Sequence, residues 1–270
     1  MGINQKNRLM IIGALTVLLG VSIYENGLNV LWIALVAIIS SLVVELLATH
    51  LRKETYDFTA YFITPLVIAL IVPYNILDHV WMVSLGVMFG LFFAKALFGG
   101  QDKNVFNAEA LGLIFIIMSF PTYLLNQKSG NVVGDLFIYT SLGLAVVLMA
   151  LKAISVYTVI SFLVTLFGFY FVSSLSNGAN PNPMDILLTT NMVFIGLFMG
   201  SEHSTGSKTN IGKLMYGITL GFLMWLINTK SSNREFAGIY AVILVNAISP
   251  LIDQFVSAYI IKPTIKEVIE

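Results

Sequence analysis

The sequence predicts an all-α polytopic membrane protein with about ten transmembrane segments. The composition is 57% hydrophobic with only 10% charged residues, whereas soluble domains average about 25% charged residues. Apolar runs also recur along the whole chain, and a run of about 20 residues is long enough to cross a bilayer. The polar stretches between them are short, so we expect a single membrane domain, residues 1–270, in the cell membrane.

The apolar segments run near 8–24, 28–49, 58–73, 79–98, 108–125, 133–151, 154–175, 185–200, 212–228 and 236–256. The first follows Lys6 and Arg8 and has no clear cleavage site after it, which predicts an uncleaved span rather than a signal peptide. The fourth ends at paired glycines. Asp57, Asp135 and Asp185 stand near segment starts, where a carboxylate is suited to capping a helix.

The third and eighth segments are short for a membrane span. The third contains or meets Pro65 and Pro73, and the eighth meets the polar residues Gly200, Ser201 and Glu202. Short, interrupted segments at matching places in two halves indicate broken helices around a site near the middle of the membrane. We therefore expect two broken helices in corresponding positions.

Two segments resemble each other at an offset of about 130 residues. Phe106 to Pro121 reads FNAEALGLIFIIMSFP, and Phe236 to Pro250 reads FAGIYAVILVNAISP. This predicts a first repeat over residues 8–125 and a second over residues 133–256. Because five spans per repeat is an odd number, the two repeats would be inverted in the membrane.

Basic residues predict the orientation. With ten spans, only Lys128, Lys230 and Arg234 fall on the side opposite the N-terminus. Cytoplasmic loops carry an excess of lysine and arginine, so we expect both termini in the cytoplasm.

The composition also excludes several kinds of site. The formal net charge is zero, which does not suggest a nucleic-acid partner. The chain has no cysteine, so it has no disulfide, thiolate-bound iron–sulfur cluster or cysteine nucleophile. The histidines, His50, His79 and His203, are scattered. We therefore expect no metal site, and no residue is predicted to be catalytic.

The first candidate site is the polar stretch KALFGGQDKNVFNAEALG, residues 95–112. Asn104 and Asn107 are three residues apart and would project to one side of a helical turn. Carboxamides both donate and accept hydrogen bonds, which suits the edge of a flavin ring, and Gly99 and Gly100 would let the backbone approach it. The alternative is that Asn104 caps the helix and the glycines end the preceding segment.

Glu45 is the second candidate, in SSLVVELLATHLRK. A carboxylate inside a span is costly and usually functional, so Glu45 is a candidate for quinone binding or for proton exchange. The alternative places it near the cytoplasmic interface, paired with Arg52 or Lys53.

The third candidate is the polar stretch from Met199 to Gly217. Glu202 and Thr205 offer hydrogen-bonding groups for a ligand, and Lys208 and Lys213 offer positive charge for a phosphate. The alternative is a hydrophilic cytoplasmic loop.

The run from Trp81 to Pro121 resembles the NqrB and RnfD membrane subunits of sodium-pumping NADH:quinone oxidoreductase and of Rnf complexes. Their pattern is close to K-x-x-[FY]-G-G-x-G-x-N-x-[FL]-N-P-A. The residues that match are Lys95, Phe98, Gly99, Gly100, Asn104, Phe106, Asn107 and Ala108. A second resemblance, over Gly200–Asp253, ends on Asn246, Pro250 and Asp253.

This resemblance implies a ten-span inverted-repeat fold similar to that of urea transporters, and electron transfer through flavins. It implies a non-covalent riboflavin or FMN at Asn104 and Asn107, and menaquinone as a candidate substrate near Glu45. Taken together with the matching motif and the polar stretch after the eighth segment, the candidate flavin-binding residues are Lys95, Gly99, Gly100, Asn104, Phe106, Asn107, Glu202 and Thr205. It implies partners as well: an extracytoplasmic FMN-binding protein, either RnfG-like or otherwise flavinylated, and a membrane quinone or NADH dehydrogenase.

The departures from the family pattern are specific. Asp102 and Lys103 interrupt the usual glycine, and Ala108-Glu109 replaces the Pro-Ala step. The family's large insertion with a flavinylated threonine is reduced to NQKSGNVVGD, residues 126–135, so covalent FMN is not expected. The pair of glycines that precedes the quinone-linked glutamate in NqrB is Ser41 and Leu42 here.

We therefore expect an electron-transfer subunit of an oxidoreductase complex rather than a stand-alone enzyme. It would carry electrons across the cytoplasmic membrane from a cytoplasmic donor or the quinone pool to an extracytoplasmic acceptor, as in flavin-based extracellular electron transfer. Two alternatives remain: a transporter or channel for a small solute or a flavin on the same fold, and a structural subunit that anchors a redox partner.

Overall fold

The computed structural model describes residues 3–53, 59–98, 104, 106–121, 134–176, 191–202, 205–231 and 236–261. These residues are helical with short connections, and no strand occurs among them. The first half contains α1 (Ile3–Asn26), α2 (Asn29–Arg52), α3 (Thr59–Ile71), the 3₁₀ turn η1 (Tyr74–His79), α4 (Trp81–Leu91), the π-helical turn η2 (Phe92–Ala96) and α5 (Ala108–Ser119). The second half contains α7 (Asp135–Ala150), α8 (Val156–Ser176), α10 (Met192–Phe198), α11 (Asn210–Lys230), α12 (Ala237–Val256) and the π-helical turn η4 (Ser257–Ile261).

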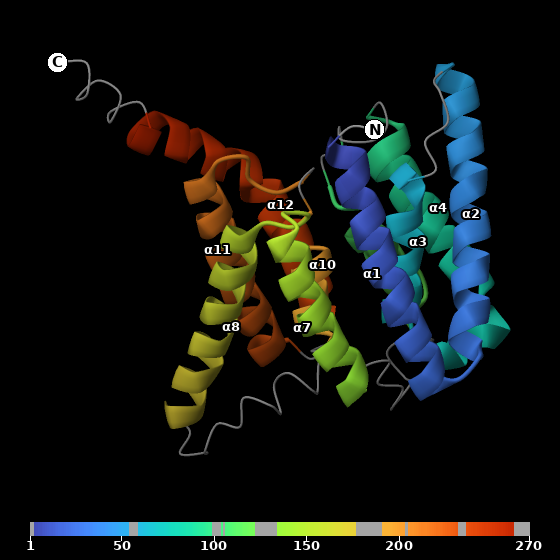
Figure 1. Cartoon of the computed structure of the whole chain (residues 1–270), viewed down its shortest axis with the longest axis horizontal. Helices are drawn as coiled ribbons and strands as arrows, with labels where there is room; N and C mark the ends of the chain where they lie inside the picture. Colours follow the sequence, from blue (N-terminus) through green and yellow to red (C-terminus); the bar gives the residue numbers. More distant parts are fainter. Residues whose placement is uncertain are drawn as a thin grey trace.

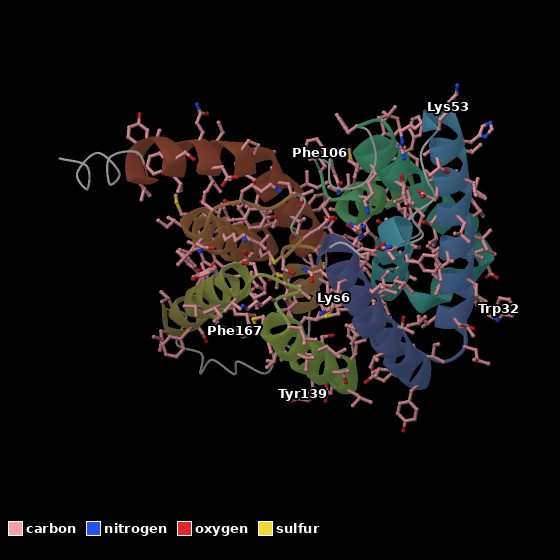
Figure 2. The ribbon with its side chains drawn as sticks, turned by 45° about the horizontal axis from the view of Figure 1, so that its top comes forward. Lys6, Trp32, Lys53, Phe106, Tyr139 and Phe167 are labelled. Atoms are coloured by element: carbon pink, nitrogen blue, oxygen red, sulfur yellow. The ribbon has the colours of Figure 1, made fainter. Side chains whose placement is uncertain are left out.

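Each predicted apolar segment overlaps one of these helices. Five helices of the described chain are long and apolar enough to cross a membrane: α1, α2, α8, α11 and α12. Bulky apolar side chains are exposed along them, such as Trp32 at 60% and Val164 at 67% of their full accessible surface. In Figure 2, Trp32 and Tyr139 point outward from the bundle. Such an apolar exterior suits contact with lipid, and the chain is a multi-pass membrane protein.

The predicted short helices are α3 and α10, with 13 and 7 residues. α4, α5 and α7 are also short, with 11, 12 and 16 residues. The sequence does not predict this. All residues of α10 are buried, and so is the run from Thr64 to Ile71 in α3. A helix that is apolar and buried on all sides belongs to the interior of a bundle, so α3 and α10 are the central helices of their halves.

The helices form two groups that lie side by side (Figure 1). Within the first group α3 packs on α1, α2, α4 and α5, and within the second α10 packs on α7, α8, α11 and α12. The main contacts between the groups are α1 with α7 and α5 with α12. If α1 to α5 correspond in order to α7, α8, α10, α11 and α12, these two contacts each join a helix to its own counterpart.

Pro65 explains a polar contact inside the first half. Proline has no backbone N–H, so the carbonyl of Tyr61, four residues earlier in α3, lacks its helical donor. The Ser41 hydroxyl of α2 donates to that carbonyl oxygen at 2.6 Å. The contact satisfies a buried acceptor and fixes α2 against α3.

Glycines allow close packing in both halves. In α4, a Cβ at Gly90 would collide with the carbonyl oxygen of Ala108 in α5. In α11, a Cβ at Gly221 would come within 2.8 Å of the carbonyl oxygen of Phe162 in α8. Gly86 and Gly217 stand four residues before these glycines, which gives the small-xxx-small spacing of closely packed membrane helices.

The last helix, α12, contains Pro250. The C-terminal part of α12 projects away from the bundle (Figure 1). Leu251, Phe255 and Tyr259, which follow the proline, are exposed. The start of α1 and the end of α12 lie toward the same end of the bundle (Figure 1).

Candidate functional site between the two halves

Asn107 begins α5 and also reaches the second half. Its side-chain oxygen accepts a hydrogen bond from the backbone N–H of Ala110 at 2.8 Å, which makes Asn107 the N-cap of α5. Its amide nitrogen donates to Glu202 Oε2 at 2.8 Å and to the Met199 carbonyl at 3.4 Å. The alternative in which Asn104 caps the helix is wrong, because α5 begins at Ala108 and its cap is Asn107.

Asn104 approaches the same carboxylate. Its amide nitrogen donates to Glu202 Oε1 at 3.3 Å, so each asparagine contacts a different carboxylate oxygen. Thr205 Oγ1 lies 3.5 Å from Glu202 Oε2, at the outer limit of a hydrogen bond. We call Asn104, Asn107, Glu202 and Thr205 the inter-half cluster, because the asparagines come from the first half and the other two residues from the second.

All four residues of this cluster are among the ligand-binding residues that the sequence predicts. The structure brings them together although almost a hundred residues separate the asparagines from Glu202. Asn104, Asn107 and Thr205 are buried, and Glu202 is partly buried. The cluster lies at the N-terminus of α5, where the helix dipole and the amide donors favour negative charge.

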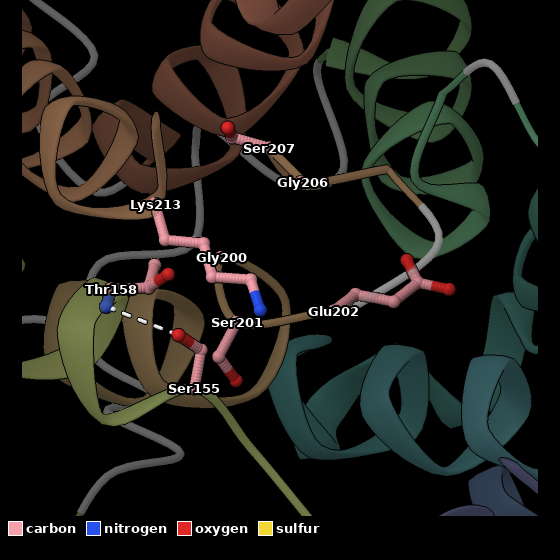
Figure 3. A pocket seen from close by; sticks show the side chains of 8 residues that line it. All are labelled: Ser155, Thr158, Gly200, Ser201, Glu202, Gly206, Ser207 and Lys213. Atoms are coloured by element: carbon pink, nitrogen blue, oxygen red, sulfur yellow. Dashed lines mark hydrogen bonds between the residues drawn. The ribbon is translucent and has the colours of Figure 1, made fainter. Parts of the chain in front are cut away.

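A small pocket adjoins Glu202 on the side of the second half (Figure 3). Its lining residues are Ser155, Thr158, Gly200, Ser201, Glu202, Gly206, Ser207 and Lys213. In Figure 3 the Lys213 side chain points toward Ser201, while the Glu202 carboxylate points away from Lys213 and toward α5. The pocket volume is about 10 Å³, which holds roughly one water molecule.

The rest of the polar stretch after α10 has structural roles. The Thr209 hydroxyl accepts a hydrogen bond from the Gly212 N–H at 3.0 Å, so Thr209 is the N-cap of α11. The backbone N–H of Lys208 donates to both Asp253 carboxylate oxygens at 3.1 Å, and the Ser207 hydroxyl contacts the same carboxylate. These contacts fasten the stretch to α12.

Lys95 belongs to a different polar cluster. Its ammonium donates to Thr64 Oγ1 at 3.1 Å. The Thr64 hydroxyl in turn donates to Glu109 Oε1 at 2.7 Å. All three side chains are buried, with at most 2% of their surface exposed. We call them the lysine–glutamate cluster. Sequence reasoning missed Thr64 and did not treat Glu109 as a site residue, although a carboxylate at the start of an apolar helix was a usable signal.

Glu45 is buried, with 1% of its surface exposed. Its carboxylate hydrogen-bonds the Tyr61 hydroxyl, and Arg52 Nη2 lies 3.4 Å from the same hydroxyl. Arg52 Nη1 donates to the Ala96 carbonyl at 3.1 Å. Of the two basic residues that sequence reasoning paired with Glu45, Arg52 therefore shares a tyrosine with it, whereas Lys53 is exposed.

The remaining predicted residues are Phe106, Gly99 and Gly100. Phe106 is partly buried, and Figure 2 places it at the boundary of the two halves. Both glycines lie outside the described residues. In the described part of the chain no group of three or more histidine or acidic side chains is placed to hold a metal ion.

A buried pair that sequence reasoning did not select lies in the second half. The Tyr216 hydroxyl donates to Asn246 Oδ1 at 2.6 Å, and the Glu202 carboxylate is near enough to interact electrostatically with that tyrosine. The Asn246 amide nitrogen is buried and has no hydrogen-bond partner among the described residues. Because the partner of Asn246 is a tyrosine 30 residues earlier in the chain, no local pattern pointed to the pair.

Comparison with known proteins adds a family. The NQR2, RnfD, RnfE family matches residues 4–137 and 122–262. The chain is similar to the B subunit of the Na(+)-translocating NADH-quinone reductase of Ectopseudomonas mendocina, with 28% identity over 257 residues, which cover 78% of this chain and 63% of that protein. It is also similar to the D subunit of the ion-translocating oxidoreductase complex of Erwinia tasmaniensis, with 24% identity over 327 residues and 92% of each chain covered. The same protein of Shigella flexneri is 26% identical, with 93% of each chain covered. The chain thus spans less than two thirds of the reductase protein and most of the oxidoreductase-complex protein.

Proposed function

Because the chain belongs to the NQR2, RnfD, RnfE family, we propose that it is a membrane electron-transfer subunit of an oxidoreductase complex. It carries electrons across the cytoplasmic membrane through a non-covalently bound riboflavin or FMN. The donor is a cytoplasmic protein or the quinone pool, and the acceptor is an extracytoplasmic protein, as in flavin-based extracellular electron transfer.

The observation that carries this proposal is the convergence of two buried carboxamides and a hydroxyl on one point between the halves. Asn104, Asn107 and Thr205 all direct hydrogen-bonding groups at the position that Glu202 fills. Neutral amides can donate to the carbonyl oxygens of an oxidised flavin and accept from its ring N–H. A flavin edge bound there would therefore find partners of both kinds.

The donor set fits a flavin, but the ring needs more room than the adjoining pocket gives. Pockets for small ligands enclose about 300–1,000 Å³, whereas the pocket beside Glu202 has a volume of about 10 Å³. The ring would thus take the place of the Glu202 carboxylate and break its bonds to Asn104 and Asn107. Residues 99–103 and 203–204, which flank the cluster in sequence, lie outside the described residues.

When bound, the flavin would supply a carrier that accepts electrons on one side and releases them on the other. The chain's own residues hold and tune it. The asparagines orient the ring edge, and the N-terminus of α5 favours the negative charge of a reduced ring. Asn104, Asn107 and Thr205 are buried between the halves, which limits the access of water to the ring edge.

We propose the inverted-repeat architecture as part of this function. Residues 8–125 and 133–256 form the repeats, and ten spans place both termini in the cytoplasm. The support is the equivalent position of α3 and α10 and the pairing of α1 with α7 and of α5 with α12. A site between two such repeats lies near the middle of the membrane, within reach of carriers on both sides.

A single bound flavin requires electron-transfer partners on both sides of the membrane. An extracytoplasmic FMN-binding protein, RnfG-like or otherwise flavinylated, would receive the electrons, and an NADH dehydrogenase or menaquinone would supply them. Glu45 remains a candidate for quinone-linked proton exchange, because its carboxylate is buried beside Tyr61 and Arg52.

The test is a visible absorption spectrum of the detergent-purified protein, followed by flavin fluorescence of the denatured supernatant. We expect a yellow protein that releases its flavin on denaturation. The double variant Asn104→Ala/Asn107→Ser should lose the flavin while remaining folded. Colourless wild-type protein that catalyses uptake of riboflavin or another small solute into liposomes would contradict the electron-transfer proposal and support a transporter.

A further inference from the structure

The lysine–glutamate cluster connects an ammonium to a carboxylate through one hydroxyl. Lys95 comes from η2, Thr64 from α3 and Glu109 from the first turn of α5. Lys95 Nζ donates to Thr64 Oγ1 at 3.1 Å, and the Thr64 hydroxyl donates to Glu109 Oε1 at 2.7 Å. Both hydrogen bonds run in the same direction, from the cation toward the carboxylate, so they can pass a proton along the chain.

Burying such a cluster has a high cost that stability alone does not explain. Taking an ammonium and a carboxylate out of water costs several kcal/mol per ion, and apolar residues of similar volume often serve as well or better. Inside a membrane, ionisable side chains usually mark ion or proton pathways. The second carboxylate oxygen, Glu109 Oε2, is buried and has no hydrogen-bond partner among the described residues, which leaves it available to release or accept a proton.

The first turn of α5 places this carboxylate next to the inter-half cluster. Asn107 and Glu109 are two residues apart and face different sides of the helix. Asn107 contacts Glu202 of the second half, and Glu109 contacts Thr64 of the first. A negative charge that forms at the inter-half cluster would therefore lie within one helical turn of Glu109.

The surroundings contain few other charges. Among the described residues of the elements packed against α5, namely α3, α4, η2 and α12, the charged side chains are Lys95 and Asp253. Asp253 is held by Ser207 and by the backbone N–H of Lys208. Glu202 is the further carboxylate that Asn107 contacts.

We propose that Lys95, Thr64 and Glu109 form a proton relay that serves the inter-half cluster. This rests on the proposed function, in which a reducible ring acquires negative charge there. A proton leaves Lys95 Nζ for Thr64 Oγ1 while the Thr64 hydroxyl proton moves to Glu109 Oε1. One N–H and one O–H bond break, two O–H bonds form, and no electron moves. The ion pair becomes an amine and a carboxylic acid, and the amine then takes up a proton from solvent.

The first test needs no flavin. Infrared difference spectra of the full-length protein in detergent, recorded between neutral and acidic pH, report the carbonyl band of a protonated carboxyl group. The Glu109→Gln variant identifies the band by its loss. After transfer to D₂O, Thr64→Val should slow deuterium exchange of this band by at least about tenfold, since positioned proton transfer contributes factors of that order or more. Thr64→Ser, which keeps the hydroxyl, should restore fast exchange.

The second test adds riboflavin as the probe. Proton uptake on reduction by dithionite is followed with an indicator dye in weak buffer. We expect Thr64→Val and Glu109→Gln to take up protons at least about tenfold more slowly than the wild-type protein, and Thr64→Ser to recover most of the rate. Thermal unfolding and gel filtration show whether each variant is folded, and Glu109→Gln, nearly equal in shape, remains informative if Thr64→Val is not.

The outcomes separate the two proposals. Equal exchange and uptake rates in folded Thr64→Val and wild-type protein overturn the relay while leaving flavin binding intact. The absence of any Glu109-dependent carboxyl band across the pH range also overturns it. If wild-type protein binds no riboflavin, the proposed function fails, and the exchange rates in flavin-free protein still decide on the relay.

Discussion

The two polar atoms of the Asn107 side chain have different roles. The oxygen caps α5, and the amide nitrogen reaches Glu202. Serine retains the capping oxygen but is too short to bridge to the second half. The residue therefore offers a way to separate helix stability from ligand binding.

We predict that Asn107→Ala lowers the free energy of unfolding by about 1 kcal/mol more than Asn107→Ser does, because both variants lose the hydrogen bond to Glu202 and only alanine also loses the cap. Both variants should lose the flavin. Thermal unfolding in detergent and the flavin-to-protein ratio are the two measurements. Full flavin occupancy in Asn107→Ser would show that the amide does not hold the ring.

At the residue scale, the sequence indicates candidate residues where a residue type is unusual for its surroundings. Asparagines and a glutamate beside apolar runs are costly to bury, so Asn104, Asn107 and Glu202 were visible as candidates. The sequence does not indicate Thr64, because a threonine inside an apolar helix looks ordinary until its neighbours are known. It also assigned Lys95 to the ligand site, since a sequence does not reveal how a helix is rotated about its axis.

At the scale of single elements, α3 shows how a proline creates a requirement elsewhere in the chain. Pro65 leaves the Tyr61 carbonyl without its helical donor, and Ser41 of α2 supplies the missing hydrogen bond. Ser40, the preceding residue, donates instead to the Val36 carbonyl within its own helix at 2.7 Å. Both serines are buried, so they form a matched pair.

We predict that Ser41→Ala lowers the free energy of unfolding by about 1–3 kcal/mol, because it leaves a buried acceptor without a partner. Ser40→Ala should change it much less, since the Val36 carbonyl keeps its helical hydrogen bond. Thermal or denaturant unfolding of the two variants in the same detergent gives the comparison. Equal losses would mean that Ser41 contributes only packing.

The contact between α4 and α5 gives a second prediction for an element. Gly90→Ala should destabilise the protein by about 1–3 kcal/mol, because the added methyl group collides with the Ala108 carbonyl and overpacking has costs of this size. Gly20→Ala in α1 is the control, since a Cβ there meets no atom within 4 Å. A Gly90→Ala protein as stable as Gly20→Ala would show that α5 can shift without loss.

Element positions followed from the sequence better than element lengths. Hydropathy is a local property, so the predicted apolar segments coincide with helices. The lengths of α4, α5 and α7 depend on how the chain turns between segments, which hydropathy does not record. The segments of α3 and α10 stand out in the sequence because they are short and bounded by prolines or polar residues, whereas their central position follows from their burial in the structure.

At the scale of the whole molecule, the described residues of the two halves contact each other at few points, and polar contacts occur there. Glu25 near the end of α1 accepts a hydrogen bond from the backbone N–H of Leu136 in α7 at 3.1 Å. The inter-half cluster provides a second such contact. If the cluster fastens the halves, Asn107 and Glu202 should be energetically coupled, whereas Asn107 and Glu25 should not.

We predict a coupling energy of about 1.5–3 kcal/mol between Asn107→Ser and Glu202→Ala in a double-mutant cycle, as for hydrogen bonds to charged groups. The control cycle, Asn107→Ser with Glu25→Ala, should be additive to within about 0.5 kcal/mol. Unfolding free energies of the single and double variants supply both cycles. Additivity in the first cycle would mean that the cluster does not join the halves in solution.

The first turn of α5 has a mechanical consequence. Asn107 and Glu109 are two residues apart on the same rigid turn. Asn107 hydrogen-bonds to the second half and Glu109 to the first, so neither can be displaced alone. A tilt of this turn by a fraction of an ångström lengthens hydrogen bonds on one flank and changes those on the opposite flank in the same movement. A change in the hydrogen bonds on one side of this helix start therefore changes those on the other side, and no loop has to rearrange.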